Sequence, residues 1–426
     1  MKKGQSLGVL LPLASLLFCS SAVLAAEASP WQFDGQYRLR YESLQNAYRA
    51  NAHGDDSVLA SQLLASLKYQ GENLLGQVEL EDARTWLDDS GTPLGSDDVN
   101  TLEPLQAWLG WHDGDKWQVR VGRQTLDIGS RRLMARQRFR NTINAFDGIY
   151  GSYNDGFATW QGFYFNPVTI RPDNRQDLDH NKTHLDKESN DHVWGLDWNH
   201  KGATDWELYY YGTDSNRGQL KLSTLGFRNL NAIAANQWHY EVEAAYQFGD
   251  NGDLDVNAGM FHGQIGYQFD DALASRLSLL ADYASGDSDP NDGKSQRFNT
   301  LFGVSRFDFG PTGIYGAFAR TNIISPGVQW DFKPAIGKSA FIAYRAVWLA
   351  SAHDSQSRSG LRDTSGDSGR FVGHQIEARW RIDLMKQLQL EIGAAYLIKG
   401  EFFRDAPSAP DDGNTRYFYT QATYKF

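Results

Sequence analysis

Five arginines fall within ten residues of this chain and form a dense cluster of side chains that could do chemistry. They are Arg131, Arg132, Arg136, Arg138 and Arg140. The planar guanidinium fork matches the geometry of a carboxylate, and several moderate contacts in series can bind a polyanion while still letting it move. Only Asp127 and Asp147 flank the cluster in the sequence. The chemistry predicted here is recognition of anions.

A second motif concerns metal binding. Asp287, Asp289 and Asp292 form a candidate calcium loop, but Gly293 falls one position late for a helix–loop–helix site. A solvated loop is therefore the favoured interpretation, and we expect no metal and no cofactor.

A third motif resembles a catalytic signature. Residues 366–369 read Gly-Asp-Ser-Gly, as in trypsin-like proteases, but Arg370 stands where a second glycine should follow. The same loop carries His353 and Ser368, so a membrane-embedded hydrolase stays open as an alternative from another class. The favoured prediction is that the chain is not an enzyme and has no catalytic residue.

The composition limits what kind of protein this is. The chain has 426 residues, 13% of them aromatic, with 41 Gly and only 12 Pro. Its mean hydropathy is −0.53 and its pI is 5.4. Past the first 26 residues no apolar run approaches the roughly 18 residues of a spanning helix, which excludes a helical membrane protein. The net charge of −11 argues against a nucleic-acid partner, because phosphate binding needs positive charge.

The N-terminus predicts export from the cytoplasm. Lys2 and Lys3 precede an apolar stretch that ends in small residues, so residues 1–26 are predicted to be a signal peptide. The alternative is a single N-terminal membrane anchor. Cys19 lies in this segment, so residues 27–426, predicted to be one barrel domain, contain no cysteine for a disulfide.

Most of the remaining chain alternates apolar and polar residues, as in a β-strand with one apolar face. In the segment 31–41 the residues Trp31, Phe33, Tyr37 and Leu39 share one face, while Arg38 lies on the other. The same alternation recurs at 63–70, 117–121, 194–199, 240–248 and 376–383. In a membrane barrel such an apolar face points at lipid and carries aromatic girdles. We therefore expect the aromatic residues on the lipid face and not in a core.

Short and long breaks alternate between these segments. Tight-turn sequences such as Gly71-Glu72-Asn73 and Ile336-Gly337-Lys338 are separated by long polar connections, near 46–56, 88–101, 127–143, 168–190, 285–319, 351–370 and 400–413. This asymmetry is typical of an all-β fold, an antiparallel transmembrane barrel with short periplasmic turns and long extracellular loops.

Counting along the chain predicts eighteen strands, with sixteen as the alternative. The expected strands lie near 31–45, 57–70, 74–86, 102–112, 116–126, 144–153, 157–167, 190–200, 204–213, 221–229, 237–248, 254–269, 274–284, 320–334, 338–350, 371–383, 387–399 and 415–426. The pattern is least regular at 221–229 and at 297–319. The terminal Phe426 resembles the assembly signal of bacterial outer-membrane barrels.

Several longer stretches resemble the alginate export family of outer-membrane porins. They are residues 78–86, 92–100 with 105–107, 119–148 and 283–287. The resemblance implies an eighteen-stranded monomeric barrel with an arginine-rich constriction that passes the polyuronate alginate.

The cations predicted to line such a pore come from strand parity and from the arginine cluster. They are Arg38, Arg40, Lys68, Arg120, Arg123, Arg131, Arg132, Arg136, Arg138, Arg140, Arg345, Arg379 and Arg381. The structural alternative is that these cations pair with carboxylates of the wall, among them Glu79, Glu81, Asp197, Glu241, Glu243, Glu377 and Asp383.

The prediction that follows is an outer-membrane channel for an anionic polysaccharide, alginate or its oligouronates, acting by passive diffusion. A general porin for small carboxylates is the alternative. The expected partners are the polysaccharide, outer-membrane lipid, the barrel assembly machinery, and periplasmic export or degradation proteins.

Overall fold

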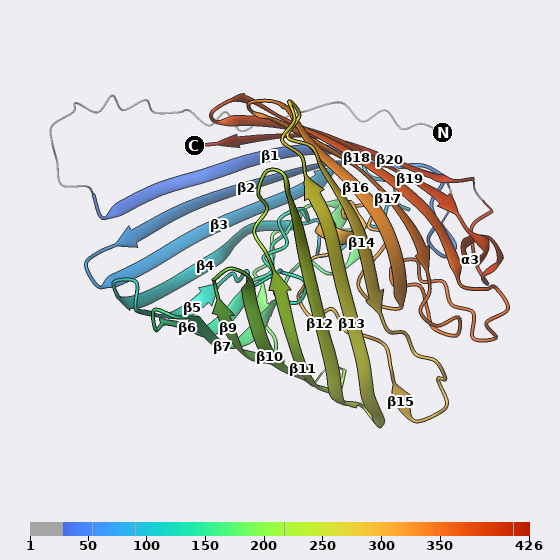
Figure 1. The fold of residues 1–426 in the computed structure, drawn as a ribbon, viewed down its shortest axis with the longest axis horizontal. Coiled ribbons are helices and arrows are strands. Elements are labelled where there is room, and N and C mark those ends of the chain that lie inside the picture. Colours follow the sequence, from blue (N-terminus) through green and yellow to red (C-terminus); the bar gives the residue numbers. More distant parts are fainter. Residues whose placement is uncertain (1–28, 53, 90, 217, 412) are drawn as a thin grey trace.

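The strands predicted from the alternation of side chains are present, and they form one closed sheet (Figure 1). The computed structural model describes residues 29–52, 54–89, 91–216, 218–411 and 413–426. The expected signal peptide, residues 1–26, lies outside the described residues. No helix within the described ranges is long and apolar enough to cross a membrane.

Eighteen long strands make the barrel wall in the described part of the chain. They are β1 (Trp31–Gln45), β2 (Asp56–Gln70), β3 (Leu74–Trp86), β4 (Asn100–Asp113), β5 (Trp117–Gln124), β6 (Phe146–Asn154), β7 (Thr159–Thr169), β9 (His192–His200), β10 (Asp205–Ser215), β11 (Leu220–Leu230), β12 (Gln237–Asn251), β13 (Leu254–Gln268), β14 (Arg276–Ala284), β16 (Ile323–Ala335), β17 (Lys338–Trp348), β18 (Phe371–Met385), β19 (Leu388–Lys399) and β20 (Thr415–Lys425).

The other elements are short and belong to loops. They are the two-residue strands β8 (Lys187–Glu188) and β15 (Lys294–Ser295), and the helices α1 (Arg175–Asp179), α2 (Arg306–Phe309) and α3 (Glu401–Asp405). The prediction of eighteen strands is confirmed and the alternative of sixteen is wrong. The irregular segment 221–229 forms β11, whereas 297–319 contributes no strand to the wall.

The sheet closes where its first strand meets its last. The first strand β1 runs antiparallel to β20, with Tyr37 opposite Tyr424 and Gln45 opposite Arg416. In Figure 1 the blue and red ends of the chain lie side by side at this seam. Closure leaves no edge strand with unpaired backbone groups, which lipid could not satisfy.

The two ends of the barrel differ as predicted. One end, here called the short-turn end, carries the connections 71–73, 114–116, 155–158, 201–204, 231–236, 269–275, 336–337 and 386–387. The other end, here called the long-loop end, carries most of its residues in the connections 46–55, 87–99, 125–145, 170–191, 285–322, 349–370 and 400–414. Both 216–219 and 252–253, at the same end, are short.

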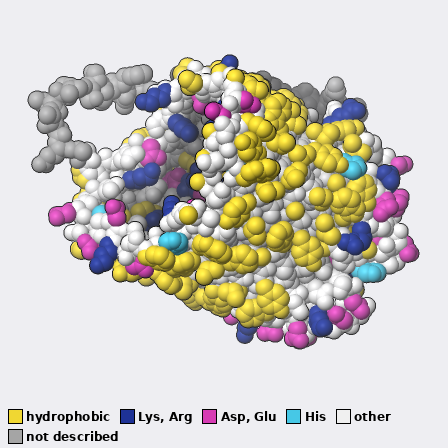
Figure 2. Space-filling model, in the orientation of Figure 1, with side chains coloured by type: hydrophobic (Ala, Val, Ile, Leu, Met, Phe, Trp, Pro, Cys, Tyr) yellow, Lys and Arg dark blue, Asp and Glu magenta, His cyan; other side chains and the backbone are white. Residues whose placement is uncertain are grey.

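The faces of the wall follow the sequence parity. On β1, Trp31 and Phe33 are 56% and 63% exposed, whereas Arg38 and Arg40 are 4% and 1% exposed. Figure 2 shows the resulting surface, where apolar side chains cover a broad band around the strands. An apolar face turned outward from a polar interior is the pattern of a barrel in lipid.

Two long loops fold into the barrel and pair there. Loop 125–145 and loop 285–322, here called the paired inner loops, are joined by a bond from the Phe302 amide to the Leu133 carbonyl, 2.9 Å, and by one from Val304 to Arg131, 3.0 Å. Met134 and Phe302 form an isolated β-bridge. Backbone contacts therefore join the paired inner loops inside the lumen.

The paired inner loops give the barrel an apolar core, which corrects one expectation. Phe146, Phe165, Phe309 and Tyr315 are almost completely buried and belong to one cluster with residues of both loops. The aromatic residues are thus divided between the lipid face and the interior. Strand parity alone could not show this, because the core forms only when the loops enter the lumen.

Candidate functional site

A cavity of about 870 Å³ lies inside the barrel toward the short-turn end, and we call it the vestibule. Seven cationic side chains line it: Arg38, Lys68, Arg120, Arg136, Arg138, Arg381 and Lys425. Only three of the described lining residues have a side-chain carboxylate: Asp34, Glu79 and Asp127. Figure 2 shows the molecule hollowed near the beginning of β1, with dark blue Lys and Arg side chains in the hollow. An acidic protein therefore encloses a locally basic space.

A second cavity, of about 370 Å³, lies toward the long-loop end. Its charged lining consists of Arg49, Asp97, Asp98, Arg140 and Arg358. Burial raises the pKa of the Asp98 carboxyl to about 7, and the neighbouring Asp97 adds to the shift. This second cavity is thus less basic than the vestibule.

The segment 136–140 separates the two cavities. Arg136 and Arg138 line the vestibule, whereas Gln137 and Arg140 line the second cavity. An anion that passed from one cavity to the other along this segment would meet an arginine at every second residue. Three of the five arginines of the predicted cluster, Arg136, Arg138 and Arg140, therefore lie between the two cavities.

The barrel wall holds this segment by its backbone. Arg38 donates to the carbonyl oxygens of Arg138 and Arg140, each at 2.7 Å. Arg40 donates to the carbonyl oxygen of Phe139 at 2.5 Å and lies over its ring, 4.4 Å from the centroid. Arg40 is also paired with Glu42 at 2.7 Å. These two wall arginines position the segment rather than extend freely into a cavity.

Each arginine of the segment has a carboxylate partner. Arg136 pairs with Glu79 of β3 at 2.8 Å, and it also donates to the Thr125 hydroxyl. Arg138 pairs with Asp127 at 3.1 Å, and its side chain is 70% exposed. Arg140 pairs with Asp97 from the loop 87–99. The sparse carboxylates near the cluster in the sequence were misleading, because Glu79 and Asp97 are brought in by the fold.

Arg132 joins the paired inner loops to the wall. Its guanidinium bonds to Asp308 at 3.1 and 3.2 Å, to Glu243 at 2.7 Å and to Glu241 at 2.5 Å. Burial alone would lower the pKa of Arg132, but Asp308 and the two glutamates raise it well above its usual value. Arg132 therefore stays charged. The side chain of its neighbour Arg131 lies over the Phe307 ring, 4.3 Å from the centroid, and has no ion pair within the described residues.

The other predicted wall cations fall into two groups. Four form ion pairs: Lys68 with Asp34, Arg123 with Glu103 and Asp147, Arg345 with Asp282, and Arg381 with Glu391. Two have ring contacts only within the described residues: Arg120 with Trp108 and Tyr150, and Arg379 with Phe341. The expected ladder of ion pairs thus accounts for many of these cations, but not for Arg120 and Arg379.

Four further interior arginines escaped the sequence analysis. Arg306 pairs with Glu377 at 2.7 Å, and Arg320 pairs with Asp308. Arg49 donates to the carbonyls of Ile314 and Tyr315. Arg228 pairs with Glu207 and Glu241. Parity along β11 could have found Arg228, but the other three lie in loops, where no periodicity indicates which residues point inward.

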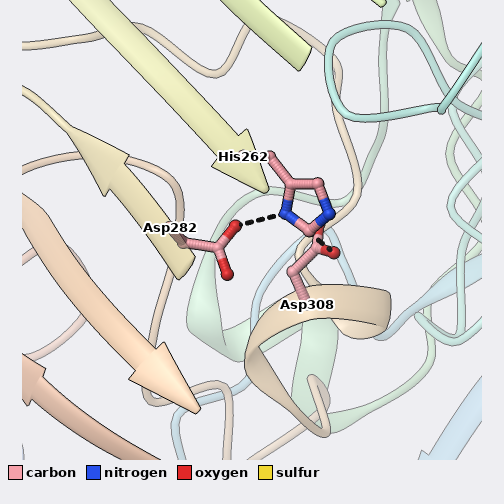
Figure 3. Close-up of side chains that lie close together, drawn as sticks. All are labelled: His262, Asp282 and Asp308. Carbon is pink, nitrogen blue, oxygen red and sulfur yellow. Dashed lines mark hydrogen bonds and ion pairs between the residues drawn. The ribbon is translucent and has the colours of Figure 1, made fainter. Parts of the chain in front are cut away.

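A buried trio near the paired inner loops could suggest a metal site. His262 bonds through Nδ1 to Asp282 at 2.7 Å and lies 3.9 Å from Asp308 (Figure 3). The possible ligand atoms of the three residues lie within 4.8 Å of one another. Arg345 already binds Asp282, and Arg132 and Arg320 bind Asp308. Guanidinium groups therefore occupy the carboxylates and disfavour a cation there.

The candidate calcium loop uses its carboxylates for its own backbone. Asp289 accepts from the Asn291 amide at 3.0 Å, and Asp292 accepts from the Lys294 amide at 2.9 Å. Within the described residues these aspartates, together with Asp287, belong to no group of three close ligands.

The hydrolase alternative needs a serine close to a histidine. Ser368 donates to Asp363 at 2.6 Å, while the ring of His353 lies 3.0 Å from the Thr364 carbonyl oxygen. No hydrogen bond links Ser368 with His353 in the described loop. The structure therefore does not assemble the pair that this alternative required.

Comparison with known proteins agrees with the fold. The model of a family described as alginate export matches residues 29–415. Several solved structures are similar. OpdK of Pseudomonas aeruginosa, solved with vanillate, has a TM-score of 0.62 at 13% identity, covering 93% of this chain and 98% of that one.

OccAB1 of Acinetobacter baumannii has a TM-score of 0.62 at 11% identity, covering 93% and 96% of the two chains. The outer membrane protein OprD of Pseudomonas aeruginosa has a TM-score of 0.59 at 11% identity, covering 93% and 94%. No curated protein matches the sequence. At such low identities the similarity to these structures concerns the fold.

Proposed function

Because this chain belongs to the alginate export family, a family of outer-membrane porins, we propose that it is a channel for an anionic polysaccharide, alginate or its oligouronates. The barrel is an outer-membrane barrel, and we place its short turns on the periplasmic side and its long loops outside, as is typical of such barrels. The polysaccharide moves by passive diffusion, and the chain acts as a monomer without catalysis.

The observation that carries this proposal is the charge of the path. The vestibule has seven cationic side chains against three side-chain carboxylates, and the segment 136–140 lies between it and a second cavity. An uronate chain carries a carboxylate on every sugar, so it can exchange one arginine contact for the next while it moves. Among the predicted pore residues we assign this role to Arg136, Arg138 and Arg140.

The test is the anion preference of single channels in planar bilayers. Replacing Arg136, Arg138 and Arg140 by alanine should move the reversal potential in a salt gradient toward cation preference, because Glu79, Asp127 and Asp97 then lose their partners. A triple variant of Lys333, Lys338 and Lys386, which line none of the cavities described above, removes the same charge near the short turns. An unchanged reversal potential in the arginine variant would refute the proposal.

The substrate class is tested in the same bilayers. Oligouronates should block the current transiently, with longer oligomers giving longer blocks, whereas neutral glucans of equal length should not. If neither oligouronates nor neutral glucans blocked the current, the channel would be a general porin.

A channel for small carboxylates is the second candidate, and one observation favours it. OpdK, whose barrel is similar, was solved with the aromatic acid vanillate. Competition separates the two candidates, because vanillate should relieve an oligouronate block only if both use the same arginines.

Further partners are proposed from the strand ends and the outer face. Phe426 exchanges backbone hydrogen bonds with Gly35 at 2.9 and 3.1 Å, and the residue is 43% exposed. An aromatic C-terminus at the short-turn end is accessible to the barrel assembly machinery, while the apolar band contacts outer-membrane lipid. Periplasmic proteins of polysaccharide export or degradation would meet the channel at this same end.

A further inference from the structure

We propose that the vestibule is a binding site for a hydroxylated polycarboxylate, a segment of an acidic oligosaccharide, and that Arg120 is its anchoring residue. The inference rests on the proposed function and adds a place and a residue to it. The vestibule then holds its ligand on the periplasmic side of the segment 136–140.

The size and position of the vestibule suit a ligand. Its volume of about 870 Å³ lies within the roughly 300–1,000 Å³ of small-molecule sites. Its lining includes the beginnings of β1 and β3 and the ends of β2 and β20, so it lies at the short-turn end. The segment 136–140 bounds it on the opposite side.

Most cations of the vestibule already have partners. The three carboxylates of its lining are each bonded to one of its cations: Asp34 to Lys68, Glu79 to Arg136 and Asp127 to Arg138. Arg38 donates hydrogen bonds to two backbone carbonyl oxygens of the segment 136–140, and Arg381 pairs with Glu391, which is not part of the lining. Arg120 and Lys425 are different, because no ion pair or hydrogen bond of either side chain is found in the described chain. Lys425 is exposed, whereas Arg120 is held inside the cavity wall.

The position of Arg120 is nevertheless well defined. Its guanidinium carbon lies 5.1 Å from the ring centre of Trp108 and 4.8 Å from that of Tyr150. Contacts with ring faces fix a guanidinium group without satisfying the N–H donors in its plane. The Nε atom of Arg120 is buried without a partner. A planar donor group held in this way is prepared for a carboxylate, which can accept two parallel hydrogen bonds.

The neutral part of the lining indicates what else the ligand carries. Six glutamines line the vestibule: Gln36, Gln62, Gln77, Gln106, Gln389 and Gln421. The Oε1 atom of Gln421 is buried without a partner. Phe426 is the only aromatic residue of the lining in the described chain. Amides both donate to and accept from hydroxyl groups, so this surface suits an acidic sugar better than an aromatic acid.

Calorimetry on the full-length protein in detergent tests the site. The probe is a linear tetramer of β-1,4-linked mannuronate, compared with cellotetraose and with vanillate. We expect the tetramer to bind, cellotetraose not to bind, and vanillate to bind more weakly than the tetramer. Arg120→Gln should weaken tetramer binding at least tenfold.

Two further variants separate charge from fold. Arg120→Lys keeps the charge but loses the planar fork, so its affinity should fall between those of the wild type and Arg120→Gln. Lys338→Gln removes one charge at the beginning of β17, outside the vestibule, and should change the affinity less than twofold. If Arg120→Gln fails to fold, Arg120→Lys still tests the site.

Each contrary result identifies what is wrong. Equal tetramer affinity in the wild type and both Arg120 variants, or no tetramer binding at all, overturns the site. Equal binding of cellotetraose, or tighter binding of vanillate, overturns the ligand class. The proposed function fails separately, when the channel shows no anion preference that depends on Arg136, Arg138 and Arg140.

Discussion

Replacing Arg132 by methionine should release the paired inner loops from the wall and raise the channel current. Arg132 belongs to one of these loops, binds Asp308 of the other loop and binds Glu241 and Glu243 of β12. Its side chain is 8% exposed, and those of Asp308 and Glu243 are 7% and 2% exposed. Methionine keeps the unbranched apolar stem of the side chain but removes the guanidinium group, so these carboxylates lose their shared cation.

The expected magnitude follows from the burial of the ion pairs. Removing one partner of a buried ion pair costs about 3–5 kcal/mol, because the remaining charge is uncompensated. Every 1.4 kcal/mol corresponds to about a tenfold change in an equilibrium constant. The ratio of docked to released loops should therefore decrease by a factor of about a hundred to a few thousand. We expect the smaller factor, because two of the carboxylates keep another arginine partner: Arg228 still pairs with Glu241, and Arg320 still pairs with Asp308.

Single-channel recording in planar bilayers measures this change. We expect Arg132→Met to give a higher mean conductance and frequent transitions between levels, together with faster hydrogen exchange of residues 303–316. Arg131→Met is the matched control, since its neighbouring side chain contacts the Phe307 ring and should leave conductance unchanged. Wild-type conductance, noise and exchange in Arg132→Met would refute the view that Arg132 holds the loops.

Two other predictions concern the same interior. A Cβ atom on Gly303 would lie 1.7 Å from the Arg132 carbonyl oxygen. Gly303→Ala should therefore separate the paired inner loops and raise conductance, as Arg132→Met does. A conductance equal to that of the wild type would show that the backbone can shift without undocking the loops. Burial and then Asp97 raise the pKa of Asp98 from 3.8 to about 7, so the stability that comes from its neutral form is complete below pH 3.8 and is lost as the pH rises through 7. The melting temperature should therefore fall between pH 5.5 and 8, by less in Asp98→Asn, and an equal fall in both proteins would contradict the assignment.

The alternation of side chains predicted the wall well, because each wall strand has one face toward lipid and the other toward the polar interior. The expected strands at 31–45 and 74–86 coincide with β1 and β3. Even the irregular segment 221–229 forms β11, because its backbone bonds to β10 and β12 complete the closed sheet. In lipid a missing strand would leave two open edges, so closure overrides a weak local pattern.

The interior could not be predicted in the same way. Loop residues have no periodicity, so nothing local indicates that Asp308 meets Arg132 or that Phe302 pairs with Leu133. The arginine cluster was recognised as important, but its partners Glu79 and Asp97 come from other parts of the chain. The buried aromatic residues were assigned to the lipid face for the same reason.

Paired arginines are not an objection to an anion path, because exchange is what makes movement possible. A bare arginine in a narrow lumen would hold a carboxylate tightly, and conduction needs sites that a ligand can leave. When a substrate carboxylate replaces Asp127 on Arg138, one ion pair breaks as another forms, so the net change in free energy is small. Asp127 is 25% exposed and Arg138 is 70% exposed at their side chains, so this pair can exchange without large desolvation. Arg120, which has no such internal carboxylate, should then hold the ligand longest, and the net charge of −11 has no bearing on where it stops.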